Sequence, residues 1–103
     1  MIAVVLSPAA ERDIDDAVDY LEAVAGSGIA EAFIANIERA FRLLEAQPAI
    51  GALRLARLAR RPGLRVWSLR GFEYLICYEL FGEVLTVVRV LHMARDIASL
   101  IND

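Results

Sequence analysis

The sequence contains no lysine, one cysteine and one histidine. A single cysteine excludes an internal disulfide bond and favours a reducing, cytoplasmic location. One histidine without a second histidine or cysteine beside it falls short of the usual zinc ligand sets, so we expect no metal and no cofactor. No apolar run reaches the roughly 20 residues that a membrane-spanning helix needs, so we expect no membrane contact.

Recognisable catalytic motifs are also missing. No glycine-rich phosphate loop, pair of catalytic carboxylates or serine-histidine-aspartate spacing stands out. The chain has 103 residues, of which 58% are hydrophobic, so it is too apolar for a disordered chain and has room for little more than one core. We therefore expect a single domain spanning residues 1–103.

Charge is unevenly distributed along the chain, although the net charge is only −3. Most charged residues among the first 45 are acidic, whereas residues 54–70 carry six arginines and no acid. Such a basic segment attracts phosphate or an acidic peptide whatever the net charge of the protein. The alternative is that arginine, in a chain without lysine, simply keeps these loops in contact with water.

Three consecutive segments in the second half of the chain have the composition of β-strands. They are Leu64–Arg70, Glu73–Leu80 and Val84–Leu91, all rich in β-branched, aromatic and other large apolar residues. Gly71 and Gly82 separate them at hairpin spacing. The sequence therefore predicts an antiparallel meander with an apolar face that needs a cover.

The alternation of side chains predicts which residues share a face of this sheet. Both faces of the middle segment are apolar, so we expect it to be the central strand. Its predicted faces are Tyr74, Ile76 and Tyr78 on one side and Leu75, Cys77 and Glu79 on the other; in the last strand they are Val87, Arg89 and Leu91 against Val88, Val90 and His92.

The N-terminal half predicts a strand followed by two helices. Ile2–Leu6 is apolar and partly β-branched, as expected of a buried strand that joins the meander. Ser7 and Pro8 suit the N-cap and the first position of a helix, and Gly26 suits its C-cap. The predicted buried residues of this first helix are Ala10, Ile14, Ala17, Val18, Leu21 and Val24 or Ala25.

A second helix is expected to open at Ser27 and Gly28 and to end at Gln47, because the residue before Pro48 is disfavoured in a helix. The very short turn requires the two helices to lie antiparallel as a hairpin, which then covers the meander. The predicted fold is α+β in the order β-α-α-β-β-β, with a mainly antiparallel sheet. The predicted buried residues of the second helix are Ala30, Phe33, Ile34, Ile37, Ala40, Phe41 and Leu44.

Two segments carry weaker signals. Residues 49–63 fit a short amphipathic helix through Leu53–Arg61, a strand or an ordered loop, and Pro62-Gly63 predicts a turn before the next strand. Met93–Asp103 is expected to be a tail with one or two helical turns through Ile97, Leu100 and Ile101.

The order of these elements resembles the RelE/ParE superfamily of bacterial toxins from type II toxin–antitoxin systems, over nearly the whole chain. The pieces that carry the resemblance are residues 6–22 (LSPAAERDIDDAVDYLE), the turn from Pro48 to Gly51, Gly63-Leu64-Arg65, residues 74–78 (YLICY), and residues 87–92 (VVRVLH) followed by Ala94-Arg95-Asp96. The resemblance implies a small toxin held inactive by an antitoxin whose C-terminal segment wraps over it.

The superfamily has two branches with different targets. RelE-like members are ribosome-dependent mRNA endonucleases, whose chemistry needs a base, cations and an acid. The residues of this chain that the resemblance offers for such a role are Arg65, His92 and Arg95. ParE-like members inhibit DNA gyrase by binding it.

The chain departs from the RelE pattern. It lacks the RelE lysines, no tyrosine follows its last strand, and its V-R-V-L-H-x-x-R-D ending resembles ParE. We therefore expect a gyrase inhibitor without a catalytic group of its own. The alternatives are the endonuclease acting on ribosome-bound mRNA, and a degenerate member that only binds the antitoxin and acts as a co-repressor.

Several side chains have either a binding or a structural interpretation. Arg89 stands inside an apolar strand, so we expect it to pair with a carboxylate of the first helix: Asp15, Asp16 or Asp19. The residues that we expect to contact the target or the antitoxin are Arg57, Arg60, Arg61, Arg65, Trp67, Arg70 and Arg95.

His92 titrates near neutrality, but we favour local hydrogen bonding, with Asp96 or a tyrosine, over a catalytic role. Trp67 suits either an interface or the core. Cys77, on the central strand, is expected to be a small buried hydrophobic residue.

Overall fold

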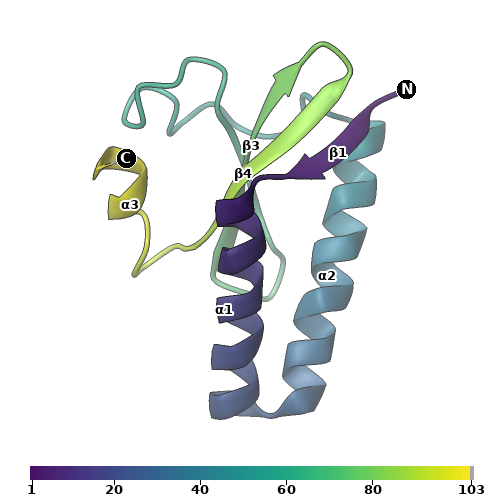
Figure 1. The fold of residues 1–103 in the computed structure, drawn as a ribbon, viewed down its shortest axis with the longest axis vertical. Coiled ribbons are helices and arrows are strands. Elements are labelled where there is room, and N and C mark those ends of the chain that lie inside the picture. Colours follow the sequence, from purple (N-terminus) through teal and green to yellow (C-terminus); the bar gives the residue numbers. More distant parts are fainter. Residues whose placement is uncertain (103) are drawn as a thin grey trace.

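The computed structural model describes residues 1–102, and the burial of residues 1–100. A short strand, β1 (Ala3–Leu6), leads into α1 (Pro8–Ala25) and α2 (Ser27–Ala46). The chain then forms β2 (Arg65–Ser68), β3 (Tyr74–Phe81), β4 (Val84–His92) and a final short helix, α3 (Ala98–Asn102) (Figure 1). This is the predicted order of a strand, two helices and three strands, with one helical turn in the tail; Asp103 lies outside the described residues.

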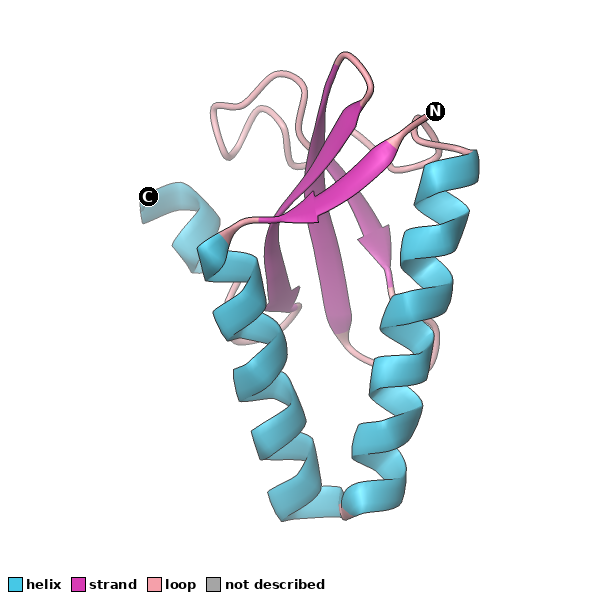
Figure 2. Cartoon of the chain, turned by 45° about the vertical axis from the view of Figure 1, so that its right-hand side comes forward, coloured by secondary structure: helices cyan, strands magenta, loops and turns pink. Residues whose placement is uncertain are grey.

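The strands form one sheet in the order β1-β4-β3-β2. The meander pairs antiparallel, as predicted, and β3 is the strand between its two neighbours. The N-terminal strand joins the sheet by pairing in parallel with β4. Parallel strands need a long connection between them, and the two helices together with β2 and β3 provide it. The two helices lie side by side over one face of the sheet (Figure 2).

The helix boundaries follow the predicted capping residues. The Ser7 side chain accepts a hydrogen bond from the amide of Ala10 at 3.0 Å, and Pro8 occupies the first turn. Gly26, with φ of 93°, ends α1 and is at the same time the N-cap of α2. Positive φ is a conformation that glycine adopts without steric cost, so one glycine makes the turn between the helices.

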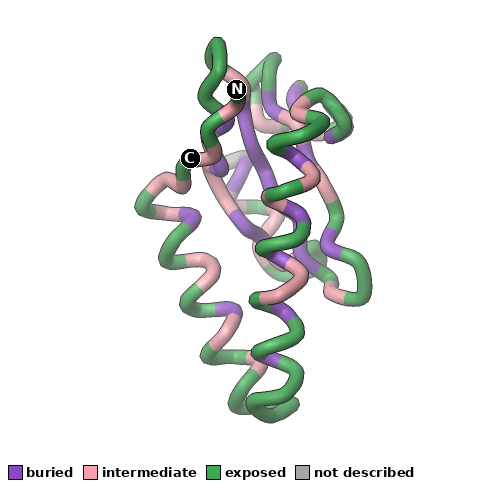
Figure 3. Tube along the Cα trace, turned by 90° about the vertical axis from the view of Figure 1, so that its right-hand side faces the viewer, coloured by how far each residue is buried: buried purple, intermediate pink, exposed green. Residues whose placement is uncertain are grey.

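The apolar face of the hairpin packs on the sheet near β1 and extends beyond it at the far end. Phe33 contacts Tyr74 and Phe72 edge to face, with ring centroids 5.1 and 5.3 Å apart. Two predicted core residues are instead exposed, Ile34 at 41% and Val24 at 62%. Val24 lies in the last turn of α1, beside the turn between the helices, which is exposed (Figure 3). Ile34 follows the buried Phe33 and lies on the exposed side of α2.

The opposite face of the sheet carries a second, smaller core. Leu75, Cys77 and Leu91 pack there against Leu64 of the loop and Leu100 of α3. Tyr74, Ile76 and Tyr78 point to the helices, so the predicted faces of β3 are confirmed. The chain thus buries both faces of its central strand without a second layer of long helices.

A β-bulge overturns the predicted faces of β4. Cys77 pairs with Arg89 and the next residue, Tyr78, pairs with Val87, which leaves one extra residue in β4. The alternation therefore slips by one, and Val87 and Val90 both face the helices. Simple alternation cannot anticipate this, because a bulge inserts a residue without changing composition.

Residues 49–63 form an ordered loop rather than a helix or a strand. Ala52 makes an isolated antiparallel bridge with Val66 of β2, and the residues after it are turns. The buried Tyr78 holds the start of the loop: its hydroxyl donates to the Pro48 carbonyl at 2.8 Å and accepts from the Gly51 amide at 2.9 Å. These two bonds fix the loop against the central strand.

Candidate functional site

Arg65, the first candidate of the nuclease hypothesis, is engaged in holding the loop. Its guanidinium donates to the carbonyls of Ala49 and Gly51 at 3.1 and 2.8 Å. Both acceptors are uncharged backbone carbonyl oxygens of the loop. The two bonds therefore orient the Arg65 side chain along the loop. Whether Arg65 also contacts a partner stays a prediction.

His92 and Arg95 lie at the end of β4 and are tied to each other and to tyrosines. The Nδ1 atom of His92 accepts from the amides of Ala94 and Arg95 at 3.2 and 3.3 Å. Arg95 donates to the Tyr74 hydroxyl at 3.2 Å and lies 4.6 Å from the ring centroid of Tyr20. An Nδ1 that accepts from backbone amides is a poor general base, so His92 here serves the turn after the strand.

Local bonding of His92 was expected, and its partners are now defined. The Asp96 carboxylate accepts from the backbone amide of His92 at 3.1 Å, and Nε2 lies 3.6 Å from the Glu73 carboxylate. The ring also meets Tyr74 edge to face at 5.2 Å. Burial raises the pKa of the Tyr74 hydroxyl above its ordinary value of 10.0.

Among the three nuclease candidates, Arg65 is separated along the sheet from His92 and Arg95. Arg65 pairs with Tyr78, and His92 pairs with Tyr74, four residues away on the same strand. At about 3.3 Å per residue, this separation is about 13 Å. General acid–base chemistry needs groups within hydrogen-bond reach of one reacting phosphate, so the distance between these backbone positions bears on the nuclease hypothesis.

Arg89 has the predicted structural partner on α1, but the residue is Asp13. Its Nε and Nη2 atoms donate to the Asp13 carboxylate at 2.8 and 3.1 Å, and the amide of Val90 adds a third bond at 2.9 Å. The prediction that Arg89 pairs with Asp15, Asp16 or Asp19 is wrong. Asp13 is three residues after Ala10 and four before Ala17, both buried, so helical spacing had put it on the inner face.

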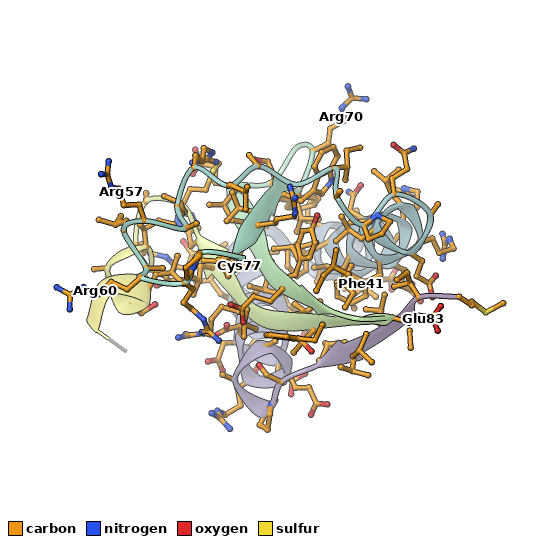
Figure 4. All side chains as sticks on the ribbon, turned by 90° about the horizontal axis from the view of Figure 1, so that it is seen from above. Phe41, Arg57, Arg60, Arg70, Cys77 and Glu83 are labelled. Carbon is orange, nitrogen blue, oxygen red and sulfur yellow. The ribbon has the colours of Figure 1, made fainter. Side chains whose placement is uncertain are left out.

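A second ion pair was not foreseen from the sequence. Arg61 bonds the Glu79 carboxylate through two nitrogens, at 3.2 and 2.8 Å, and Glu79 is buried in β3. The signal was available, since an acid inside an apolar strand requires a cation. By contrast, Arg57 and Arg60 extend from the loop into solvent, and Arg70 extends from another side of the molecule (Figure 4).

Part of the sheet face away from the helices has no cover among the described residues. Phe81 of β3 is 65% exposed, and Val84 and Val5, on neighbouring strands, are 39% and 44% exposed. Register places Val84 between Ala3 and Phe81, and Val5 lies two residues after Ala3 on the same side of β1. The three exposed side chains therefore form an apolar row with one neighbour beside it, which we call the open sheet face. Exposed apolar residues grouped in this way are typical of an interaction site.

Arginines gather at a hollow away from the tip of the β3–β4 hairpin. It has a volume of about 570 Å³ and lies between the loop, β4 and α3. It is lined by Arg60, Arg61 and Arg89 together with Val88 and Leu100, among others. Arg61 and Arg89 are paired with acids, whereas Arg60 extends outward, so the rim carries positive charge next to apolar surface.

The remaining candidates are placed as follows. Cys77 is buried, as predicted, and burial raises the pKa of its thiol to about 12. In the part of the chain that the structure describes, no group of three histidine, cysteine or acidic side chains is arranged to hold a metal ion. Within the same residues, no helix is both long and apolar enough to cross a membrane.

Known proteins agree with this architecture. Residues 4–97 match the model of a family described as the ParE toxin of the type II toxin–antitoxin system parDE. No curated protein matches the chain. A solved structure described as the chromosomal ParDE TA system from P. aeruginosa has the same fold, with a TM-score of 0.75 and 18% identity over 89% of this chain and 96% of that chain. Because the family model spans nearly all of the sequence, the chain belongs to the ParE toxin family of type II toxin–antitoxin systems.

Proposed function

We propose that this toxin inhibits DNA gyrase by binding it and has no nuclease activity. The observation that supports this is the separation of Arg65 from His92 and Arg95, about 13 Å along β3. The side chains of Arg65, His92 and Arg95 also form hydrogen bonds within the protein. A binding inhibitor needs a surface rather than a convergent set of reacting groups. The proposal includes a cytoplasmic location, where gyrase acts.

The test compares the two targets directly. Purified toxin is added to gyrase with relaxed plasmid DNA, and in parallel to ribosomes carrying a defined mRNA. We expect loss of supercoiling at micromolar toxin and intact mRNA. Full supercoiling with toxin that circular dichroism shows to be folded would refute the proposal. Codon-linked cuts that disappear in His92→Ala would instead establish the endonuclease, and inactivity in both assays would leave an antitoxin-binding co-repressor.

We further propose that the antitoxin covers the open sheet face. Membership of the family implies an antitoxin partner. Phe81, Val84 and Val5 offer an apolar row, and the guanidinium groups of Arg57 and Arg60 extend from the loop into solvent. An antitoxin segment with apolar side chains is complementary to the first surface, and acidic residues in another part of the antitoxin are complementary to the second.

This contact is tested by replacing its most exposed aromatic residue. Phe81→Ser should weaken antitoxin binding by about 2 kcal/mol, the size expected for an interface anchor. Val24→Ser is the matched control, because Val24 is 62% exposed, close to the exposed fraction of Phe81, and lies in the last turn of α1 beside the turn between the helices. Calorimetric titration with the co-encoded antitoxin measures both. Equal affinities for the two variants would show that the antitoxin binds elsewhere.

A further inference from the structure

The turn that leads from β4 into α3 is built around the ring of His92. Its Nδ1 atom accepts hydrogen bonds from the amides of Ala94 and Arg95, at 3.2 and 3.3 Å. A ring atom that faces two N–H groups must offer a lone pair, so Nδ1 carries no proton and the neutral ring has its proton on Nε2. The bonds of this turn therefore depend on one protonation state of one side chain.

Backbone bonds continue the turn into α3. The amide of Asp96 donates to the His92 carbonyl at 2.9 Å, and the hydroxyl and the amide of Ser99 donate to the Asp96 carbonyl at 2.6 and 3.0 Å. Leu100 of α3 is buried in the second core, on the sheet face away from the helical hairpin. The turn at residues 93–96 thus fixes the position of the short helix that packs on this core.

The charged and titratable groups around the ring come from four parts of the chain. The Glu73 carboxylate, in the turn before β3, lies 3.6 Å from Nε2, which is too far for a hydrogen bond. In the turn after β4, the Arg95 guanidinium bonds the Tyr74 hydroxyl and the Asp96 carboxylate bonds the backbone amide of the histidine. Tyr74 of β3 and Tyr20 of α1 line a hollow of about 390 Å³ beside the ring, together with Glu73 and otherwise uncharged residues. Of these groups, Glu73 is the one within ion-pair distance of the ring.

Protonation removes the acceptor on which the turn depends. A charged imidazole is a donor at both nitrogens, so a proton on Nδ1 would point at the amides of Ala94 and Arg95. The ring must then turn away, and both amides lose this partner. Glu73 opposes the change because its carboxylate favours a charged ring, but its side chain is 75% exposed and exposed ion pairs contribute little. The two hydrogen bonds therefore outweigh the ion pair, and the closed turn stabilises the neutral form.

We propose that His92 is an acid-sensitive switch: in its neutral form it closes the turn at residues 93–96 and fixes α3 on the sheet, and in its charged form it releases both. Histidine changes charge between roughly pH 5 and 8, and the ring borders an open hollow through which water reaches it. Because the closed turn stabilises the neutral form, its stability is complete at the upper end of this range and is lost as the pH falls. The opening is local, so its test does not depend on the gyrase or antitoxin assignments.

Nuclear magnetic resonance of the isotopically labelled full-length protein follows the ring and the turn together from about pH 8 to about pH 5. We expect the amide signals of Ala94 and Arg95 to shift with the same midpoint as the His92 ring. Hydrogen exchange at these amides, corrected for the pH dependence of exchange itself, should become about two- to tenfold faster, the value of one hydrogen bond. The amide of Leu100 in α3 should follow. Amides of either segment that keep their protection while the ring titrates would overturn the proposal.

Two uncharged variants separate the acceptor from the charge. In His92→Asn the side-chain oxygen is as many bonds from Cα as Nδ1 is, so it can accept from the same two amides, and it does not titrate. We expect the turn to stay closed throughout the pH range. In His92→Gln the oxygen is one bond further out, so the turn should be open throughout. A wild-type pH response in His92→Asn would overturn the proposal, since Glu73 and Asp96 remain in that variant, and so would full protection of the two amides in His92→Gln.

Glu73→Gln tests the group that opposes the switch. Without this carboxylate the charged ring loses its ion pair, so the midpoint should move to lower pH by roughly 0.2–0.7 pH units, the value of an exposed ion pair. Glu83→Gln is the matched control, because the Glu83 side chain is 78% exposed and pairs with the N-terminus instead. An equal shift in the two variants, or a midpoint of Glu73→Gln at higher pH, would contradict the assignment of the ring as the titrating group.

Discussion

Replacing Gly51 by alanine tests how the loop is fixed to the sheet. A Cβ atom at this position would lie 2.5 Å from the Tyr78 hydroxyl oxygen and 2.8 Å from Cε1 of the same ring. Tyr78 is completely buried and cannot move away without breaking its bonds to Pro48 and Gly51. Glycine is therefore required here for space, and not for an unusual backbone angle.

The magnitude follows from two contributions. Loss of two hydrogen bonds costs about 1 kcal/mol each, and overpacking of a core adds about 1–3 kcal/mol. We expect Gly51→Ala to lower the free energy of unfolding by about 3–5 kcal/mol. A domain of this size is stable by about 5–15 kcal/mol, so the variant should remain mostly folded. Urea unfolding followed by Trp67 fluorescence measures the change.

Two further variants make the reasoning refutable. Gly63→Ala is the control, because a Cβ atom added there would meet no other atom within 4 Å, and it should change stability by less than about 1 kcal/mol. Tyr78→Phe removes the nearest atom, so Gly51→Ala should cost less in that background. Equal effects of Gly51→Ala and Gly63→Ala, or an unchanged cost in the Tyr78→Phe background, would show that the hydroxyl does not exclude a side chain.

Three other predictions concern buried polar groups. Asp13→Asn should lower the free energy of unfolding by about 2–4 kcal/mol because it removes a part-buried carboxylate charge that accepts hydrogen bonds from Arg89 and the Val90 amide. Asp15→Asn, on the exposed side of α1, should have little effect; equal urea midpoints of the two variants would refute the assignment. Cys77, with its pKa raised to about 12, should resist iodoacetamide in the native protein and react in urea, as mass spectrometry would show; rapid native labelling would contradict its burial. Burial raises the pKa of Tyr78 above its ordinary value of 10.0, so its contribution to stability is complete below that pH and is lost as pH rises through the folded pKa; urea midpoints measured across this range should fall less steeply in Tyr78→Phe, and parallel curves would refute the link.

Local signals decided most of the fold. Ser7, Pro8 and Gly26 set the helix ends through the backbone groups they satisfy or the angles they permit. Gly71 and Gly82, both with positive φ, set the turns of the meander. The resemblance to the RelE/ParE superfamily rested on the order of these same elements, and the family match confirmed it. Each of these features involves residues close together in the chain, so a sequence alone can reveal them.

Contacts between distant residues decided the site. Arg89 of β4 pairs with Asp13 of α1, and Arg61 pairs with Glu79 across a loop whose shape the sequence left open. Periodicity assigns a face to a residue but not the residue that meets it from another element, because that depends on how whole elements pack. The same reason explains the hollow between α2 and β2 beside Trp67: its two walls are separate segments, and only their packing brought two arginines and no acid to one hollow among the described residues.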